Sequence, residues 1–262
     1  EAYWQDKFSN NVLPLRVGLD VATIDDVMGV IEILSSRREY TKLNPFIVLL
    51  GKGDHYRVVR NLIVTSSWTD ARGRVCPTTL EITRSNITFV GTGKDTTTIL
   101  GGFAIRGFEN ITFKQMTVTN TSNNGDGIFM ENAIVELIDV TLKGCSSAGL
   151  RILSTSETTL VATRCGFSNS GSGASVYGSL TSATFHNCVF NTNSNVGIFV
   201  SNRATIHLHG ETTTIHSNSR HGICAFYSAN VFIHLPSHHN TSYNNGGQDR
   251  KTQIRGTITN VE

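Results

Sequence analysis

A short motif of glycine followed by alternating apolar residues recurs through this sequence and constrains the fold more than any other feature. Successive copies begin 25, 22, 24, 24 and 25 residues apart. The copies are Gly102–Ile105, Gly127–Met130, Gly149–Ile152, Gly173–Val176, Gly197–Val200 and Gly222–Ala225. A period in this range indicates a repeat architecture, in which each unit buries its apolar face against the next unit.

Two more apolar segments occur in each repeat, and both alternate with period two. Val140 and Leu142, for example, are separated by one residue, which places both side chains on one face of a strand. Leucine-rich, ankyrin and tetratricopeptide repeats would need a helical period, which these segments lack. Three short strands per step therefore predict one coil of a parallel β-solenoid, in which equivalent strands of successive coils pair in parallel.

The N-terminal part is expected to close one end of this solenoid. Thr23 and Asp26 have the spacing of a capping box, and apolar residues follow at helical spacing. We therefore expect an all-β, single-stranded parallel β-helix with a short amphipathic cap helix. The predicted segments are an N-terminal extension and cap helix at 1–45, the β-helix at 46–246 and a C-terminal tail at 247–262. The β-helix would contain roughly eight coils and form a rod of roughly 40 Å.

Two segments resemble a known superfamily. Ile47–Tyr56 is similar to the opening strand, glycine, turn and tyrosine of right-handed parallel β-helix proteins of the pectin lyase-like superfamily, and Ile87–Gly93 is similar to one of their coils. Ile233–Asn240 resembles β-helix proteins carried by microalgae and large DNA viruses. The resemblance implies a right-handed parallel β-helix over most of the chain. It implies little about activity, because one fold hosts many functions.

Charge and composition argue against two classes of partner. The chain has 22 Lys+Arg and 20 Asp+Glu, a net charge of +2, which gives little attraction to nucleic acid or an anionic membrane. No apolar run reaches the roughly 18 residues of a transmembrane helix. Asn-X-Ser/Thr triplets begin at Asn86, Asn110, Asn120 and Asn240 and weakly support an extracellular setting. We expect an extracellular, cell-surface or virion location, with no nucleic-acid or membrane partner.

Alternation also predicts which side chains of the glycine-initiated strands face outward. Exposed aromatic rings in two neighbouring columns would form a stripe, and flat apolar rings are suited to stack on the C–H face of a sugar. The predicted carbohydrate-binding residues are Phe129, Arg151, Tyr177, Phe199 and Phe226. In the alternative interpretation, loops or a neighbouring subunit bury these rings.

Catalytic signatures occur only as fragments, and no catalytic residue is assigned. The resemblance implies that an enzyme of this superfamily would carry clustered carboxylates, or Asp with Arg or Lys, on one outer sheet. Asp126 and His221 hold corresponding positions four coils apart, or ~19 Å, whereas glycosidase carboxylates are separated by ~5 to 10 Å. Asp126 is more simply explained as a turn residue. Gly91–Asp95 lacks the spacing of a phosphate-binding loop and is expected to be a turn.

Histidines concentrate in the last third of the chain, and two cysteines share an inward column. His207 and His209 alternate onto one strand face, and His234 follows His209 by 25 residues, in the next coil. These imidazoles could bind zinc, but no Cys or carboxylate completes a ligand set in their columns, so we favour a solvated polar ladder that can respond to pH. No metal and no other cofactor is assigned. Cys165 and Cys188 are expected to be buried thiols rather than catalytic groups.

Several functions are compatible with this pattern. We favour a non-catalytic surface or virion-associated β-helix protein for structural assembly, glycan recognition or both, because the coils are regular and no catalytic set is found. The alternative is a polysaccharide-active enzyme, namely a lyase, glycoside hydrolase or epimerase acting on an extracellular or cell-wall polysaccharide. The expected partners are a glycan or polysaccharide, and protein subunits in self-assembly or in a capsid or cell surface.

Overall fold

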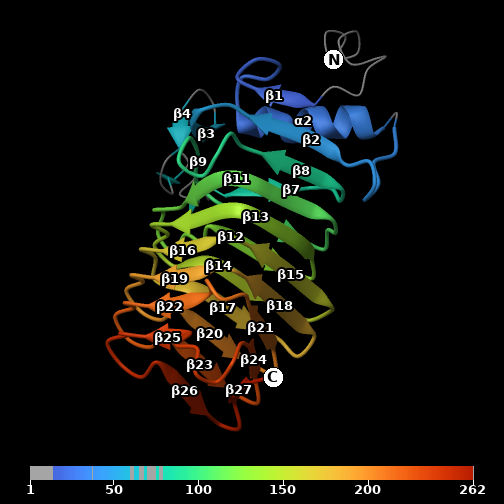
Figure 1. The fold of residues 1–262 in the computed structure, drawn as a ribbon. Helices are drawn as coiled ribbons and strands as arrows, with labels where there is room; N and C mark the ends of the chain where they lie inside the picture. The colour runs from blue at the N-terminus through green and yellow to red at the C-terminus, as the bar shows by residue number, and fades with distance from the viewer. Residues whose placement is uncertain are drawn as a thin grey trace.

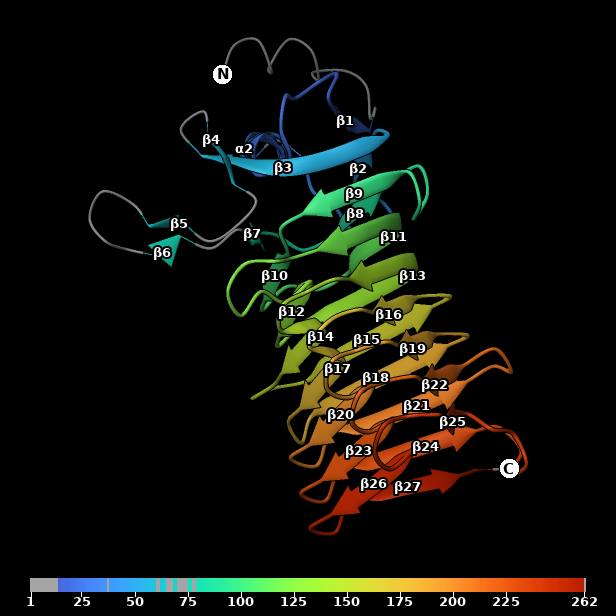
Figure 2. The same cartoon turned by 90° about the vertical axis from the view of Figure 1, so that its left-hand side faces the viewer.

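The protein is a stack of short parallel strands that winds along one axis (Figures 1 and 2). The computed structural model describes residues 14–36, 38–59, 62–64, 68–69, 75–76 and 79–261. Equivalent strands of successive coils lie side by side in parallel register. The predicted all-β parallel β-helix is therefore confirmed.

One side of the stack is an eight-stranded parallel sheet, with one strand from each coil. In order along the stack its strands are β7 (Leu80–Ile82), β10 (Phe103–Arg106), β12 (Ile128–Glu131), β14 (Ala148–Leu153), β17 (Ser172–Tyr177), β20 (Ile198–Ser201), β23 (Ile223–Phe226) and β26 (Arg250–Gln253). The register advances by 22 residues from Ile128 to Leu150 and by 27 residues from Ile223 to Arg250. Among the described residues, these eight strands are joined by seven turns of the solenoid (8 − 1 = 7), close to the roughly eight coils expected.

The other two sides form a single 17-stranded sheet, because two long strands run across the corner between them. These strands are β11 (Ile111–Thr119) and β13 (Ile134–Lys143), and each contains one residue of positive φ, Gln115 and Asp139 respectively. Beside them, one side contains β1 (Leu15–Val17), β2 (Phe46–Leu50), β8 (Ile87–Val90), β15 (Thr158–Thr163), β18 (Thr181–His186), β21 (Thr205–His209), β24 (Asn230–His234) and β27 (Thr257–Asn260). The other contains β3 (Gly53–Val59), β9 (Thr97–Leu100), β16 (Gly166–Ser168), β19 (Val189–Asn191), β22 (Thr214–His216) and β25 (Ser242–Tyr243). Two antiparallel pairings join β3 to β4 (Leu62–Val64) and β5 (Trp68–Thr69) to β6 (Val75–Cys76).

Alternating side chains from all three sides point inward and form one continuous core. Phe89 and Phe113, from neighbouring coils, stack with ring centroids 5.3 Å apart. Phe167 and Phe190 stack in the same way at 4.5 Å. Full burial of one such side chain contributes roughly 1.5–3 kcal/mol, so these columns are a major source of stability.

The two cysteines of the predicted inward column are part of this core. Cys165 and Cys188 lie in neighbouring coils, and both are buried. Burial raises the pKa of the Cys188 thiol, which keeps the thiol in its neutral, unreactive form.

The repeated glycine of the eight-stranded sheet is explained by close packing between coils. A Cβ atom on Gly127 would lie 2.7 Å from the carbonyl oxygen of Gly149, and one on Gly173 would lie 2.5 Å from that of Gly197. Real Cβ atoms essentially never approach other atoms to less than 3.0 Å. The motif therefore reflects the close approach of one coil to the next.

The predicted cap helix is α2 (Ile24–Ser35), at the N-terminal end of the stack (Figure 1). Thr23 and Asp26 form the expected capping box. Val27 and Ile31 are buried in the same core as the first strands, so the helix covers apolar surface that an end coil would otherwise expose. In the described part of the chain, no helix combines the length and apolar composition needed to cross a membrane.

Strand stacking continues past residue 246, where the sequence pattern led us to end the β-helix. β26 and β27 pair in parallel with β23 and β24. Positions that point inward in earlier coils are occupied here by Arg250, Thr252 and Asn260, and Arg250 donates a hydrogen bond to Asn260 Oδ1 at 2.8 Å. Because polar residues replace the apolar alternation, the pattern that reveals strands elsewhere is absent. The division into segments at residues 45 and 246 remains a prediction.

Candidate functional site

The outer face of the eight-stranded sheet carries the predicted carbohydrate-binding residues. The register pairs Phe129 with Arg151, Arg151 with Ser175, and Ser175 with Phe199, so these residues form one column. Tyr177 lies beside this column, two residues after Ser175 on β17. All of them except Ser175 are half-buried. The predicted alternation of inward and outward side chains therefore holds along the sheet.

Three of the four predicted aromatic side chains form one cluster. The ring centroids of Tyr177 and Phe199 are 5.5 Å apart, and those of Phe199 and Phe226 are 5.4 Å apart. These residues come from β17, β20 and β23, which are consecutive strands of the sheet. We call Tyr177, Phe199 and Phe226 the aromatic cluster; its half-buried rings leave part of their surface in solvent.

Phe129 lies apart from the aromatic cluster. The coil that contains Arg151 separates Phe129 from the coil that contains Tyr177. The guanidinium of Arg106 lies over the Phe129 ring, 4.9 Å from its centroid, and pairs with Glu81 at 2.9 Å. The aromatic stripe expected from the sequence is therefore interrupted, and Phe129 lies among the charged side chains of Arg106 and Glu81 instead.

Asp126 and Arg151 form an ion pair beside Phe129. Arg151 Nε donates to Asp126 Oδ2 at 2.7 Å, and the backbone N–H of Ala148 donates to Asp126 Oδ1 at 3.0 Å. The side chains are 13% and 29% exposed for Asp126 and Arg151. Both carboxylate oxygens are engaged, so Asp126 orders the turn before β12, as expected of a turn residue, and orients the guanidinium.

A pocket of about 420 Å³ lies next to this ion pair. Its lining includes Glu81, Arg106, Asn124, Asp126 and Phe129. Two carboxylates, one guanidinium, one aromatic ring and the amides of two asparagines thus face a space of the size that small-molecule sites occupy. Such a lining can hydrogen-bond a hydroxyl-rich ligand. Glu81 was not predicted as a site residue, although its spacing of 25 residues from Arg106, one coil, is visible in the sequence.

The opposite end of the sheet carries a basic group that the sequence analysis did not predict. Lys251 Nζ lies 3.2 Å from His221 Nε2, and the backbone N–H of Gln248 donates to His221 Nδ1 at 2.9 Å. Burial, followed by the charges of Lys251 and Arg220, lowers the pKa of His221. Cys224 is only 2% exposed although it lies in the outward column, and burial raises its pKa to about 11. Lys251 was not predicted as a site residue because it lies on β26, a strand without alternating apolar residues.

Asp126 and His221 stay far apart, as expected from the sequence. They precede β12 and β23, which are four strands apart in the sheet, or ~19 Å at ~4.8 Å per strand. The carboxylates of glycosidases lie ~5 to 10 Å apart. The structure therefore does not bring these two residues together as a catalytic pair.

Three histidines on a different side of the stack could hold a metal ion. His207 and His209 lie on β21, and His234 lies on β24. One ring nitrogen from each of them lies within 4.8 Å of the other two. The predicted placement of His234 directly beside His209 in the next coil is confirmed by the register.

Comparison with known proteins identifies the fold family. Residues 76–246 match a family model described as right handed beta helix region. The structure is similar to the A-module of mannuronan C-5 epimerase AlgE4 from Azotobacter vinelandii, with a TM-score of 0.50 and 15% identity over 78% of this chain and 64% of that chain. It also resembles pectin methylesterase PemA from Erwinia chrysanthemi (TM-score 0.47, 12% identity, 95% of this chain and 92% of that chain) and ORF18 of Geobacillus virus E2 (TM-score 0.45, 11% identity, 80% and 53%). No curated protein matches the sequence.

These low identities show a shared fold and leave activity open. The chain spans 64% of the epimerase module that it matches. The family model covers 171 of the 262 residues (246 − 76 + 1 = 171), which is well over half of the chain. With its stacked parallel coils, the chain belongs to the right-handed β-helix family.

Proposed function

We propose that this protein is a non-catalytic recognition module that binds a glycan on the outer face of its eight-stranded sheet. The observation that carries the proposal is the aromatic cluster, in which the Phe199 ring contacts the rings of Tyr177 and Phe226 on the two neighbouring strands. Each ring is half-buried, so its neighbours hold it in place while part of it stays in solvent. Flat rings held in this way can stack on the C–H faces of sugar rings.

Charged side chains at both ends of the aromatic cluster suit a polar ligand. Arg151 lies on β14, one strand before β17, and Lys251 lies on β26, one strand after β23. Both cations can donate hydrogen bonds to hydroxyl or carboxylate oxygens. The four strand steps from β14 to β26 span ~19 Å, which gives room for a short oligosaccharide. Phe129 would extend this surface beyond Arg151, next to the pocket.

The proposed setting is outside the cell, on a cell surface or on a virion. An apolar surface on an outer sheet requires a ligand, a partner or a cover. A protein subunit could supply such a cover as well as a glycan could, so structural assembly is the companion role in this proposal. Measurement of the molecular mass in solution distinguishes the two roles, because assembly through the aromatic cluster would make the mass rise with protein concentration.

A polysaccharide-active enzyme is the second candidate, and the 420 Å³ pocket is the observation that favours it. Asp126 and Glu81 both line this pocket, and Arg151 lies beside Asp126. We rank this candidate second because the oxygens of Asp126 already accept hydrogen bonds from Arg151 and Ala148, which leaves the carboxylate poorly placed to take a proton from a substrate.

A panel of polysaccharides and arrayed glycans tests the proposal, with binding and newly released reducing or unsaturated ends measured on the same samples. We expect binding without release of ends. Phe199→Ala should weaken binding by about tenfold or more, since it removes the central ring of the cluster. Tyr243→Ala is the matched control: Tyr243 is a half-buried aromatic residue on β25, on another side of the stack.

Each other outcome of this test contradicts glycan binding by the aromatic cluster. Release of ends that is abolished by Asp126→Asn would identify an enzyme. Equal loss of binding in Phe199→Ala and Tyr243→Ala would show that the aromatic cluster is not the binding surface. Absence of binding, combined with a mass that rises with concentration and falls to that of one chain in Phe199→Ala, would identify assembly as the function of this face.

A further inference from the structure

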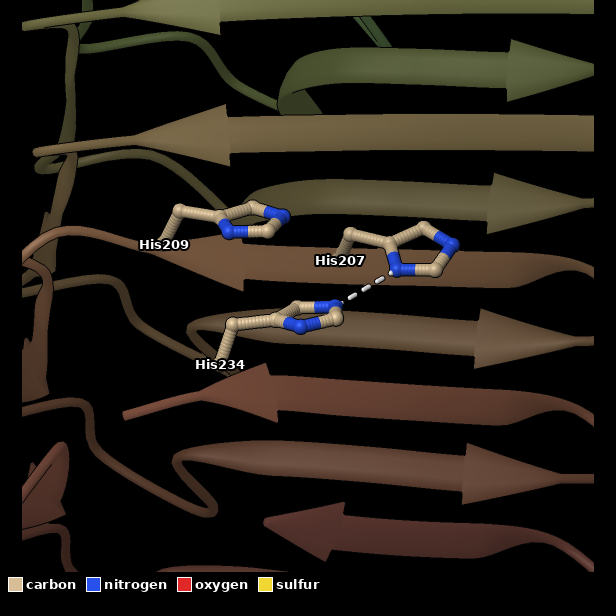
Figure 3. A group of neighbouring side chains, drawn as sticks. All are labelled: His207, His209 and His234. Atoms are coloured by element: carbon tan, nitrogen blue, oxygen red, sulfur yellow. Dashed lines mark hydrogen bonds between the residues drawn. The ribbon is translucent and has the colours of Figure 1, made fainter. Parts of the chain in front are cut away.

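The outer face of β18, β21 and β24 carries a compact group of imidazole rings. The register pairs His186 with His209 and His209 with His234, so these three form a column. His207 lies two residues before His209 and points to the same side of the sheet. Figure 3 shows His209 and His234 one above the other, with His207 beside them. We call His207, His209 and His234 the histidine triad.

The ring nitrogens of the histidine triad converge. His207 Nδ1 and His234 Nε2 lie 2.9 Å apart in a hydrogen bond, and one nitrogen from each of the three rings lies within 4.8 Å of the others. Nitrogens bound to one tetrahedral ion at 2.0–2.1 Å are ~3.4 Å apart. The separation of the His207 and His234 nitrogens lies below this value, and 4.8 Å is the upper limit for the other two pairs, so rotation of the rings can bring the three nitrogens around one ion.

The nitrogens of His209 are available for such a role. In the described part of the chain they have no hydrogen-bond partner, and the ring contacts its neighbours through stacking. The His209 and His234 rings are nearly parallel, with centroids 4.0 Å apart. A bound metal ion lies in the plane of each imidazole ring that binds it. The His209 ring must therefore tilt away from its parallel stack on His234 before both rings can bind the same ion. Its half-buried position on the outer face leaves room for that movement.

Neighbouring side chains support the orientation of two rings. Phe232 stacks on His207 with centroids 5.3 Å apart, and His186 stacks on His209 at 4.6 Å. The strands that carry the triad are held by parallel ladder hydrogen bonds on both sides. Ligands on rigid strands are favourable for a metal site, because little ordering of the backbone is required on binding.

We propose that the histidine triad binds one divalent transition-metal ion of the class that prefers imidazole ligands, with Zn²⁺ as the representative ion. Three histidine ligands leave a tetrahedral ion with one open position, and the ion keeps its full 2+ charge because all three ligands are neutral. The open position faces away from the core, where water or an anionic group of a ligand or partner could complete the coordination. The site lies on a different sheet from the aromatic cluster, so it does not depend on the glycan proposal.

Titration of the purified, metal-free protein with Co²⁺ tests this proposal, followed by competition with Zn²⁺. Tetrahedral Co²⁺ absorbs visible light much more strongly than the hydrated octahedral ion, so the absorption reports the geometry as well as the binding. We expect one Co²⁺ per chain, displaced by Zn²⁺. His234→Ala and His207→Gln should each weaken binding by more than about tenfold, since even residues that only support metal ligands cost 10–100-fold.

His216→Ala is the matched control for these variants. His216 is a half-buried histidine on β22, in the same coil as His207 but on another side of the stack, where it stacks on Tyr243 with centroids 5.1 Å apart. This variant should bind Co²⁺ like the wild type. Far-UV circular dichroism establishes that each variant is folded. The proposal is overturned if the wild type gives no tetrahedral absorption at millimolar Co²⁺, or if folded His234→Ala and His207→Gln bind as tightly as His216→Ala.

Discussion

A buried line of hydrogen-bonded asparagines allows a quantitative test of how the coils are held together. Asn193 is fully buried in the turn after β19, and its side-chain oxygen accepts from the backbone N–H of Ser170 at 3.1 Å. Its amide group donates to the carbonyl oxygen of Phe167 at 3.1 Å and to Asn218 Oδ1 at 2.8 Å. Asn218 in turn donates from its backbone N–H and from its side-chain amide to Asn245 Oδ1, at 3.1 and 2.9 Å. One side chain therefore links the turns of three coils.

We predict that Asn193→Ala lowers the free energy of unfolding by about 2 kcal/mol. The change leaves the N–H of Ser170 without its acceptor, whereas the carbonyl of Phe167 still lies in the parallel ladder between β16 and β19, and Asn218 Oδ1 keeps its bond from the backbone N–H of residue 193 at 3.1 Å. A buried polar group left unsatisfied costs ~1–3 kcal/mol, and one such group gives the predicted value. Asn191→Ala, at a half-buried outward position of β19, should change stability by less than ~0.5 kcal/mol.

Urea unfolding followed by far-UV circular dichroism measures both variants against the wild type. Asn193→Asp sharpens the test, because it keeps the acceptor for Ser170 but places a second oxygen against the carbonyl of Phe167 and against Asn218 Oδ1. At neutral pH it should destabilise at least as strongly as Asn193→Ala. A loss below ~1 kcal/mol in Asn193→Ala, or equal losses in Asn193→Ala and Asn191→Ala, would refute the assignment of stability to this line of hydrogen bonds.

Two further predictions concern protonation and backbone packing. Because the pKa of His221 in the folded protein is lowered from 6.5 by burial and by Lys251 and Arg220, the unfolded state takes up this proton first. The stability that comes from neutral His221 should be complete above about pH 6.5 and should decline as pH falls through the lower pKa of the folded state. NMR titration should show that Lys251→Ala moves the pKa of His221 upward. In calorimetry, Gly171→Ala should lower the melting temperature, since its Cβ would overlap a backbone carbonyl oxygen of the preceding coil, while Gly29→Ala, with open space around it in α2, should stabilise by ~0.5–1 kcal/mol. A neutral or stabilising Gly171→Ala, or an unchanged pKa in Lys251→Ala, would contradict these arguments.

The repeat allowed the fold to be predicted in detail because core formation in a solenoid is local. Each coil buries its side chains against the next coil, so the apolar period directly gives the strands, their faces and their approximate register. The columns through Phe129, Arg151 and Phe199, the buried pair Cys165 and Cys188, and the cap helix follow from this alternation. The glycine of each repeat adds a steric requirement that is visible in the sequence as a fixed first position.

The sequence pattern gives no signal where a strand or a contact is not encoded by apolar alternation. β26 and β27 form a further coil with polar residues such as Arg250 and Asn260 at inward positions, and the sequence analysis therefore assigned them to a tail. The separation of Phe129 from the aromatic cluster could not be foreseen either. A column gives the order of side chains along the stack, whereas ring contacts depend on rotamers and on partners such as Arg106.

Ladders of like residues thus occur both inside and outside this solenoid. A structural ladder and a functional one differ in whether neighbouring coils already occupy the hydrogen-bonding atoms of the side chains. In the buried ladder, the side-chain oxygen and nitrogen of Asn193 and Asn218 are both engaged by neighbouring coils, so the fold itself accounts for them. In the histidine triad, the described contacts of His209 are stacking contacts, and its nitrogens contribute no hydrogen bond to the fold. The aromatic cluster likewise keeps part of its surface in solvent. Folding therefore explains the asparagine ladder completely but leaves the binding capacity of the two outer groups unused, and this is the physical reason for seeking function on the outer faces.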